Sequence, residues 1–233
     1  MRKIISLGAR DYKNLIRDYV LLISFMGPLL LTSFLYFVLP IATEFLLEQL
    51  NFDLKVYYPL IYVYLILFTP MIIGVFTGFI ILDEKDDDIL SYISVTELGK
   101  AGFISYRIIS PTIISIAMSA ITVNILPLAE VSMSKTVAMI LIASLEAPLI
   151  ALFLGSFAAN KVEGLAYSKG LGLLNIAPAV SFLAQGNWRY MAGILPPFWI
   201  NEIIMGKNII TTITFATAIH FVYLYLLVKK FSK

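Results

Sequence analysis

DEKDDDILSYISVTELGKAGFISYR, residues 83–107, is the longest charged stretch between two apolar blocks, and it decides how the chain is arranged. It holds six of the fifteen Asp and Glu residues. Its apolar residues recur at three- and four-residue steps, which is the period of a helix; they are Ile89, Leu90, Ile93 and Leu98. The aspartates precede them, where a helix N-terminus favours negative charge. The pattern predicts a short amphipathic helix between two membrane spans, and a solvated connector with no partner is the alternative.

The composition of the chain is that of a membrane protein. Of its 233 residues, 60% are hydrophobic and 14% are charged, and the mean hydropathy is +0.90. Soluble domains are about half apolar and about a quarter charged, so the excess indicates that lipid surrounds much of the surface. Cysteine is absent, which excludes disulfides, thiolate chemistry and cysteine metal sites.

Six apolar runs are close to or above the roughly 20 residues that cross a bilayer core of ~30 Å. They are residues 19–43, 56–82, 108–129, 136–160, 170–188 and 208–228. Backbone groups in hydrocarbon must form their hydrogen bonds within the chain, so each run is predicted to be a helix. We therefore expect an all-α membrane protein, with one six-span transmembrane domain over residues 1–233.

The distribution of basic residues predicts which side of the membrane each connection occupies. Thirteen of the 17 Lys and Arg residues lie in one set of connecting segments and four lie in the other. The first set is 1–18, 83–107, 161–169 and 229–233, and the second is 44–55, 130–135 and 189–207. Basic loops stay inside, so both termini and the acidic stretch are expected at the cytoplasmic face of the cell (inner) membrane. The first segment also predicts an amphipathic helix on the membrane surface, unless it is merely a positive N-terminus.

The stretch YMAGILPPFWIN, residues 190–201, does not fit a plain six-span layout. Its twelve uncharged residues are too few to span a bilayer, and Pro196-Pro197 interrupts any helix. Aromatic residues that favour membrane interfaces surround it. We expect a re-entrant hairpin on the outer side between the fifth and sixth spans, or else an ordinary aromatic belt at their ends.

Signs of enzyme chemistry are missing from the sequence. There is no GxxxxGK motif followed by Ser or Thr to hold phosphate. One histidine and no cysteine argue against a zinc site, and nothing around His220 resembles a nucleophile elbow. The basic residues lie at membrane borders, which gives no support to nucleic-acid binding. We expect neither a catalytic residue nor a metal or cofactor on this chain.

Two ionisable residues lie inside predicted spans. Glu146 is near the middle of the fourth and His220 is midway along the sixth. Intramembrane ionisable groups are costly and usually face a bundle interior or a water-filled path, so both are candidates for a substrate path. Glu146 either faces a cation or substrate or satisfies a backbone kinked beside Pro148. His220 is expected to be a neutral histidine bonded to a neighbouring helix, with a place in the path as the alternative.

The acidic stretch resembles the cytoplasmic loop of type-two ABC exporter permeases. That loop typically reads Glu-(Lys/Arg)-x-x-Gly-Thr-Leu-x-x-Leu-x-Val-Thr-Pro-Leu-(Ser/Gly)-(Lys/Arg). The matching positions are Glu84, Lys85, Leu90, Ile93, Val95, Thr96, Leu98, Gly99 and Lys100, and the departures are Asp88, Ile89 and Glu97. ANKVEGLAYSKGLGLLNIAP, residues 159–178, and WRYMAGILPPFW, residues 188–199, are similar to the fluoroquinolone-export subgroup of that family.

The resemblance implies a half-transporter. Two six-helix permease subunits, identical or not, would pair, and each would dock a separate ATPase that holds the ATP and Mg. The loop between the second and third spans would be a coupling helix over roughly Asp86–Leu98, seated on the ATPase, with a lesser contact at residues 160–169. The coupling residues would be Glu84, Asp86, Asp87, Asp88, Ile89, Leu90, Ile93, Val95, Thr96, Leu98 and Lys100.

Two functions of different classes are consistent with these observations. The first is an ATP-driven exporter subunit for a drug or a short amphipathic peptide, since the apolar, aromatic-rich spans suit such cargo. The second is a proton-coupled secondary transporter or channel that uses Glu146 and His220. A membrane-embedded enzyme would need a convergent catalytic set, which the sequence does not offer.

Overall fold

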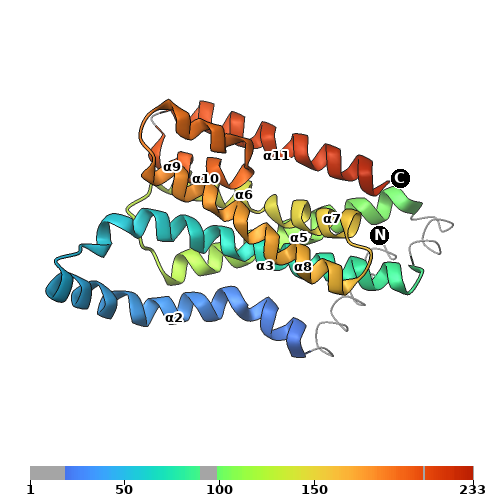
Figure 1. The fold of residues 1–233 in the computed structure, drawn as a ribbon, viewed down its shortest axis with the longest axis horizontal. Coiled ribbons are helices and arrows are strands. Elements are labelled where there is room, and N and C mark those ends of the chain that lie inside the picture. Colours follow the sequence, from blue (N-terminus) through green and yellow to red (C-terminus); the bar gives the residue numbers. More distant parts are fainter. Residues whose placement is uncertain (1–18, 90–98, 207, 233) are drawn as a thin grey trace.

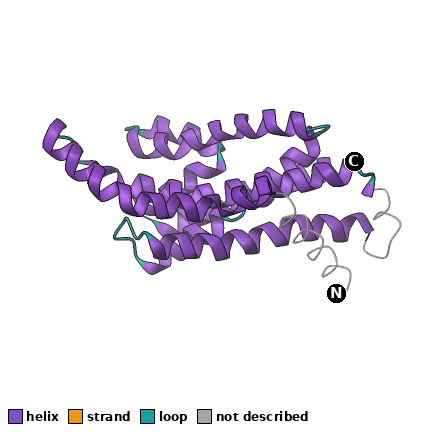
Figure 2. Cartoon of the chain, turned by 90° about the horizontal axis from the view of Figure 1, so that it is seen from below, coloured by secondary structure: helices purple, strands orange, loops and turns teal. Residues whose placement is uncertain are grey.

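The computed structural model describes residues 19–89, 99–206 and 208–232, with side chains from Met26 onward. The described residues form helices aligned along one long axis, and no strand occurs among them (Figure 1). Short loops join the helices (Figure 2). The predicted surface helix at residues 1–18 lies outside the described residues, as do positions 90–98 of the predicted coupling helix.

The described helices are as follows. The α-helices are α2 (Tyr19–Leu50), α3 (Tyr58–Asp86), α5 (Gly99–Ile125), α6 (Met133–Ala143), α7 (Glu146–Phe157), α8 (Lys161–Leu171), α9 (Ile176–Leu183), α10 (Pro196–Met205) and α11 (Ile209–Phe231). The 3-10 helices are η1 (Leu54–Tyr57), η2 (Gly172–Asn175) and η3 (Asn187–Ile194). The all-helical fold class predicted from the sequence is confirmed for this part of the chain.

Five stretches of the described chain are long and apolar enough to cross a membrane. They are Met26–Leu50, Leu54–Asp86, Gly99–Ile125, Met133–Phe157 and Ile209–Phe231. Each overlaps a predicted span, but the helices extend beyond the uncharged runs. The 32 residues of α2 measure about 48 Å, which exceeds a ~30 Å core. A charge ends an apolar run without ending a helix that continues into water, so helix ends and span limits need not coincide, and the span limits stay a prediction.

The prediction of one helix over residues 170–188 is wrong, because this region is divided among α8, η2 and α9. Its helical part begins at Lys161, inside the segment predicted as a cytoplasmic loop, and ends at Leu183. The side chain of Asn160 accepts a hydrogen bond from Glu163 N at 3.0 Å, and Glu163 Oε2 accepts one from Ala159 N at 2.8 Å. These reciprocal caps resemble a capping box and explain the early start.

α3 and α7 pack against each other at the centre of the bundle, and a pair of glycines allows them to approach closely. Gly74 and Gly78 form a GxxxG motif on α3, the spacing that brings membrane helices together. A Cβ at Gly74 would lie 2.7 Å from the carbonyl oxygen of Ala147, and one at Gly78 would lie 2.6 Å from Leu154 Cδ1. The glycines therefore set how closely α7 packs on α3, from Ala147 in its first turn to Leu154 near its end.

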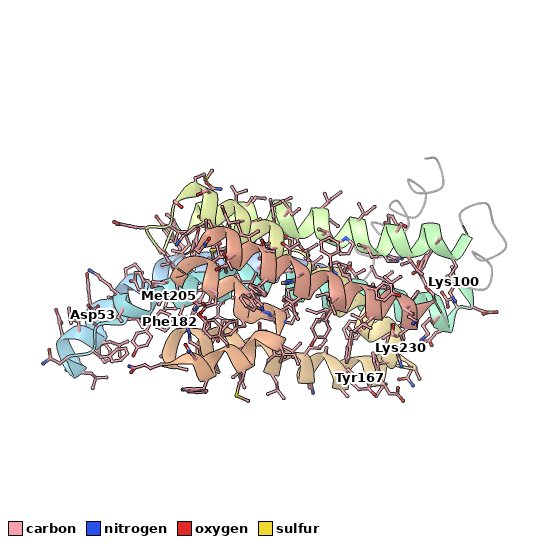
Figure 3. All side chains as sticks on the ribbon, turned by 90° about the horizontal axis from the view of Figure 1, so that it is seen from above. Asp53, Lys100, Tyr167, Phe182, Met205 and Lys230 are labelled. Atoms are coloured by element: carbon pink, nitrogen blue, oxygen red, sulfur yellow. The ribbon has the colours of Figure 1, made fainter. Side chains whose placement is uncertain are left out.

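The two ends of the bundle carry different residues. Lys100, Tyr167 and Lys230 lie at one end, and Asp53, Phe182 and Met205 lie at the other (Figure 3). At the first, α3 ends and α5 begins (Figure 1). The acidic stretch 83–107, called the bridge below, connects these two helices in the sequence, so we call this the bridge end and the other the far end.

Between α9 and α11 the chain folds into a hairpin made of η3 and α10 (Figure 1). Trp199 Nε1 donates a hydrogen bond to Gly193 O at 2.7 Å across it. At its turn, Ile194 O accepts a hydrogen bond from the Tyr223 hydroxyl of α11 at 3.1 Å. The hairpin thus reaches the middle of α11, and its re-entrant character and its place on the outer side of a membrane stay predictions.

A buried polar network fastens the hairpin to α9. The Ser181 hydroxyl donates to Glu202 Oε1 at 2.6 Å and accepts from Asn201 Nδ2 at 2.8 Å. Arg189 donates to Glu202 Oε2 at 3.1 Å and to the carbonyl oxygen of Ser181 at 2.9 Å. Buried polar groups are stable only when paired, so these contacts favour a single arrangement of the hairpin.

Candidate functional site

The candidate substrate-path residue Glu146 is the first residue of α7, at a break in a membrane-spanning stretch. α6 ends at Ala143, and the turn at Ser144–Leu145 interrupts the helix before α7 begins. Glu146 is only 5% exposed. Ser144 and Leu145 keep helical dihedral angles, and Leu149 N donates to Leu145 O across the turn at 3.4 Å. The alternative that Glu146 satisfies a backbone kinked beside Pro148 stays a prediction.

The structure brings His220 next to Glu146. His220 lies on α11, is fully buried, and has its Nδ1 2.7 Å from Ala216 O. Its Nε2 is 3.3 Å from Glu146 Oε1. These two atoms are close but lack hydrogen-bond alignment, and within the described chain neither has another hydrogen-bond partner. The sequence named both residues as candidates for a substrate or proton path, and the fold brings them together.

An apolar pocket of about 590 Å³ opens beside this pair, between α7, α8 and α11. Its lining comprises Glu146, Leu149, Ile150, Phe153, Phe157, Ala166, Tyr167, Gly170, Leu171, Leu174, Leu195, Pro196, Tyr223, Leu226, Leu227 and Lys230. This volume lies within the range of about 300–1,000 Å³ that is typical of small-molecule sites. The turn of the hairpin, at Leu195 and Pro196, forms part of the wall next to Glu146.

The chemistry available in the pocket follows from the pair. Glu146 with a neutral His220 carries one negative charge, and with a protonated His220 the pair is neutral. A buried polar atom without a hydrogen-bond partner costs roughly 1–3 kcal/mol. A ligand that donates a hydrogen bond to Glu146 therefore gains more binding free energy than it would at an exposed carboxylate. The site is suited to binding a cation or exchanging a proton. No group of three metal-ligating side chains occurs among the described residues.

A second cluster of charged residues lies at the bridge end. Glu84 Oε1 accepts a hydrogen bond from Arg107 NH2 at 2.6 Å, and the two side chains are 4% and 2% exposed. The guanidinium carbon of Arg107 lies 5.3 Å from the ring centre of Phe103 and 5.2 Å from that of Tyr106. This buried pair joins the end of α3 to the start of α5.

Lysines extend these connections to other helices. Lys85 Nζ donates to the carbonyl oxygens of Gly155 and Ala158, at 3.0 and 3.2 Å, at the C-terminus of α7. Lys100 Nζ donates to Ser232 O, at 2.6 Å, at the C-terminus of α11. A cation at a helix C-terminus also interacts favourably with the helix dipole. Both flanks of the bridge are thus attached to the helices that carry Glu146 and His220.

The predicted coupling residues have different environments. Asp86, Asp87 and Asp88 are exposed, whereas Glu84 is buried in its pair with Arg107. Ile89 packs against the cluster around Phe103 on α5. Lys100 is exposed and holds the end of α11. Leu90, Ile93, Val95, Thr96 and Leu98 lie outside the described residues.

Lys230 and Tyr223 belong to the pocket and were not identified from the sequence. A signal for them existed, because positions 3, 7 and 10 after His220 share its helix face. They hold Tyr223, Leu227 and Lys230, and all three line the pocket. Arg107 was likewise missed as a buried group, since it was counted only as the charge that ends the bridge.

The chain is similar to known membrane permeases. It matches the family described as Fluoroquinolones export permease protein Rv2686c-like over residues 11–229. Two curated relatives from Mycobacterium tuberculosis, strains CDC 1551 / Oshkosh and ATCC 25618 / H37Rv, are named Fluoroquinolones export permease protein MT2760 and Rv2686c. Each is 29% identical over 201 residues, which covers 85% of this chain and 80% of the relative. No solved structure matches the chain.

Proposed function

The chain belongs to the family of Rv2686c-like fluoroquinolones export permeases, and from this premise we propose that it is the membrane subunit of an ATP-driven exporter of drug-sized amphipathic compounds. Its relatives are named for fluoroquinolones, and compounds of that kind are the first cargo to test. The observation that carries the proposal is the apolar pocket of about 590 Å³ with the buried Glu146 in its wall. A pocket of that size suits a small drug better than a peptide of several residues.

The proposed source of energy is a separate ATPase, which would hold ATP and Mg. The sequence has no phosphate-binding loop of its own. The ATPase would dock on the coupling helix at roughly Asp86–Leu98, and a second permease subunit, identical or not, would complete the transporter. Both termini would be cytoplasmic in the cell membrane, the α8–η2–α9 stretch would complete six spans, and the hairpin would be re-entrant from outside.

The attachments of the bridge support this coupling. Lys85 contacts the end of α7 and Lys100 contacts the end of α11, so a movement of either flank bears on helices that form the pocket. ATP can shift the populations of inward- and outward-facing states only by its differential stabilisation of one of them. In this proposal the ATPase supplies that difference and the two lysines transmit it.

Reconstitution tests the proposal. The permease is placed in liposomes with a candidate ATPase, and efflux of a fluorescent fluoroquinolone is followed with ATP, without ATP, and with an ATPase variant that cannot hydrolyse it. Ile93→Asp should abolish stimulation of ATP hydrolysis. It is preferred over a change at Ile89, which packs against α5 and would also affect folding. Efflux that is equal with and without hydrolysis would refute the ATP-driven assignment.

A second candidate function is proton-coupled transport. The observation in its favour is the 3.3 Å separation of Glu146 and His220 in a buried site, since such pairs can take up and release protons along a transport path. It predicts efflux driven by a pH gradient in liposomes that contain the permease alone. Glu146→Gln should abolish that efflux. An ATP-driven exporter, in contrast, should show no efflux in these liposomes even as wild type, because they contain no ATPase.

A further inference from the structure

The pocket has opposite charges at its two ends. Glu146 lies level with His220, 3.3 Å away, and Lys230 Nζ lies 4.1 Å from the ring centre of Phe157. Phe157 lies 11 positions after Glu146 on α7, and Lys230 lies 10 positions after His220 on α11. The two helices therefore run in the same direction, and a rise of 1.5 Å per residue places the two charged levels about 15 Å apart.

The wall toward the Lys230 end is aromatic. The rings of Phe153 and Phe157 stack with centres 4.7 Å apart, and Tyr167 meets Phe153 edge-on at 5.9 Å. Both Lys230 and Tyr167 lie at the bridge end (Figure 3). Flat rings interact with such surfaces in stacked or edge-to-face geometry, so this wall favours a planar aromatic ligand over a flexible aliphatic one.

The two charges differ in their surroundings. Glu146 is 5% exposed, and its Oε1 has no hydrogen-bond partner among the described residues. Lys230 is exposed and lines the pocket at the bridge end (Figure 3). An interaction with a buried charge is stronger than one with a charge in water, so Glu146 contributes more to binding and Lys230 mainly sets orientation.

We propose that the pocket binds a planar aromatic zwitterion, with its amine at Glu146 and its acidic group at Lys230. This inference rests on the proposed export function and adds to it the residues that bind the two ends of the ligand and hence its orientation in the pocket. Lipid headgroups do not match the pattern, because their opposite charges are adjacent, whereas the two ends of the pocket are about 15 Å apart. A ligand with only one charge would use only one end.

Three probes of related shape separate the contributions. Norfloxacin carries a basic amine and a carboxyl group at opposite ends of its ring system, its methyl ester keeps only the amine, and nalidixic acid has only the carboxyl group. Binding is measured by the change in probe fluorescence with the full chain in lipid nanodiscs. The variants are Glu146→Gln and Lys230→Gln. Lys229→Gln is the matched control, because Lys229 is exposed on the same helix but does not line the pocket.

Glu146→Gln should weaken norfloxacin and its ester by about ten- to a hundredfold and leave nalidixic acid unchanged. Lys230→Gln should weaken norfloxacin and nalidixic acid by about two- to fivefold and leave the ester unchanged. Lys229→Gln should change none of them.

Equal loss of all three probes in a pocket variant, an equal effect of Lys229→Gln, or no binding to wild type would overturn the assignment. Lys230→Gln keeps the test decisive if Glu146→Gln fails to fold, because Lys230 is exposed. The measurement needs no ATPase. The expected binding pattern without ATP-driven efflux would therefore reject the proposed function alone, and efflux without the pattern would reject this inference alone.

Discussion

The buried pair of Glu84 and Arg107 should be far more important for stability than the exposed pair next to it. Arg107→Gln removes the charged member of a buried ion pair with Glu84, and breaking a buried pair in this way costs about 3–5 kcal/mol. In the adjacent pair, Asp83 Oδ1 and Lys161 Nζ are 2.8 Å apart, with side chains 39% and 47% exposed. An exposed pair contributes about 0–1 kcal/mol, so Asp83→Asn should change stability little.

The comparison is made by thermal unfolding of the purified variants in detergent. For a chain of this size, 1 kcal/mol corresponds to roughly 2–4 °C in Tm, so Arg107→Gln should lower Tm by about 6–20 °C and Asp83→Asn by at most about 4 °C. A double variant, Glu84→Met with Arg107→Met, replaces both charges by apolar groups and should recover most of the loss. Equal losses for Arg107→Gln and Asp83→Asn, or a double variant worse than either single change, would refute this reasoning.

Two further changes test the packing. Gly74→Ala places a methyl group 2.7 Å from the backbone oxygen of Ala147 and should cost about 1–3 kcal/mol in detergent unfolding, whereas Gly27→Ala, with nothing within 4 Å, should be neutral or slightly stabilising. Losses of the same size at both glycines would contradict the close α3–α7 contact. Arg189→Lys keeps the charge but loses the forked hydrogen bonds to Ser181 and Glu202; it should speed proteolytic cleavage in the hairpin, and an unchanged cleavage rate would contradict the role given to the network.

The helical class and the approximate places of five spans followed from the sequence. An uncharged run of that length in lipid must satisfy its backbone hydrogen bonds internally, and a helix does so within one segment. Helix ends were less predictable. Charges at Glu44 and Glu48 suggested a loop, but α2 continues to Leu50, since a helix leaving the membrane can carry charges on its last turns. The division of residues 161–183 into three helical pieces depends on local caps and tertiary contacts that an apolar run does not record.

The candidate site was predictable as two residues but not as a pair. An ionisable group inside a span is informative by itself, which identified Glu146 and His220. Their 3.3 Å separation depends on how α7 packs against α11, and no periodicity within either helix encodes that. Lys230 was within reach of the sequence, because it shares a helix face with His220, but its position near the membrane border made it indistinguishable from an ordinary anchoring lysine.

The short helix α7 has a different contact at each of its ends. Glu146 begins it, and Lys85 binds the carbonyl oxygens of Gly155 and Ala158 at its C-terminus. From Glu146 to Phe157 the helix measures about 16 Å. In the proposed coupling, a force on Lys85 therefore acts on the same helix that presents the carboxylate to His220 Nε2, 3.3 Å away.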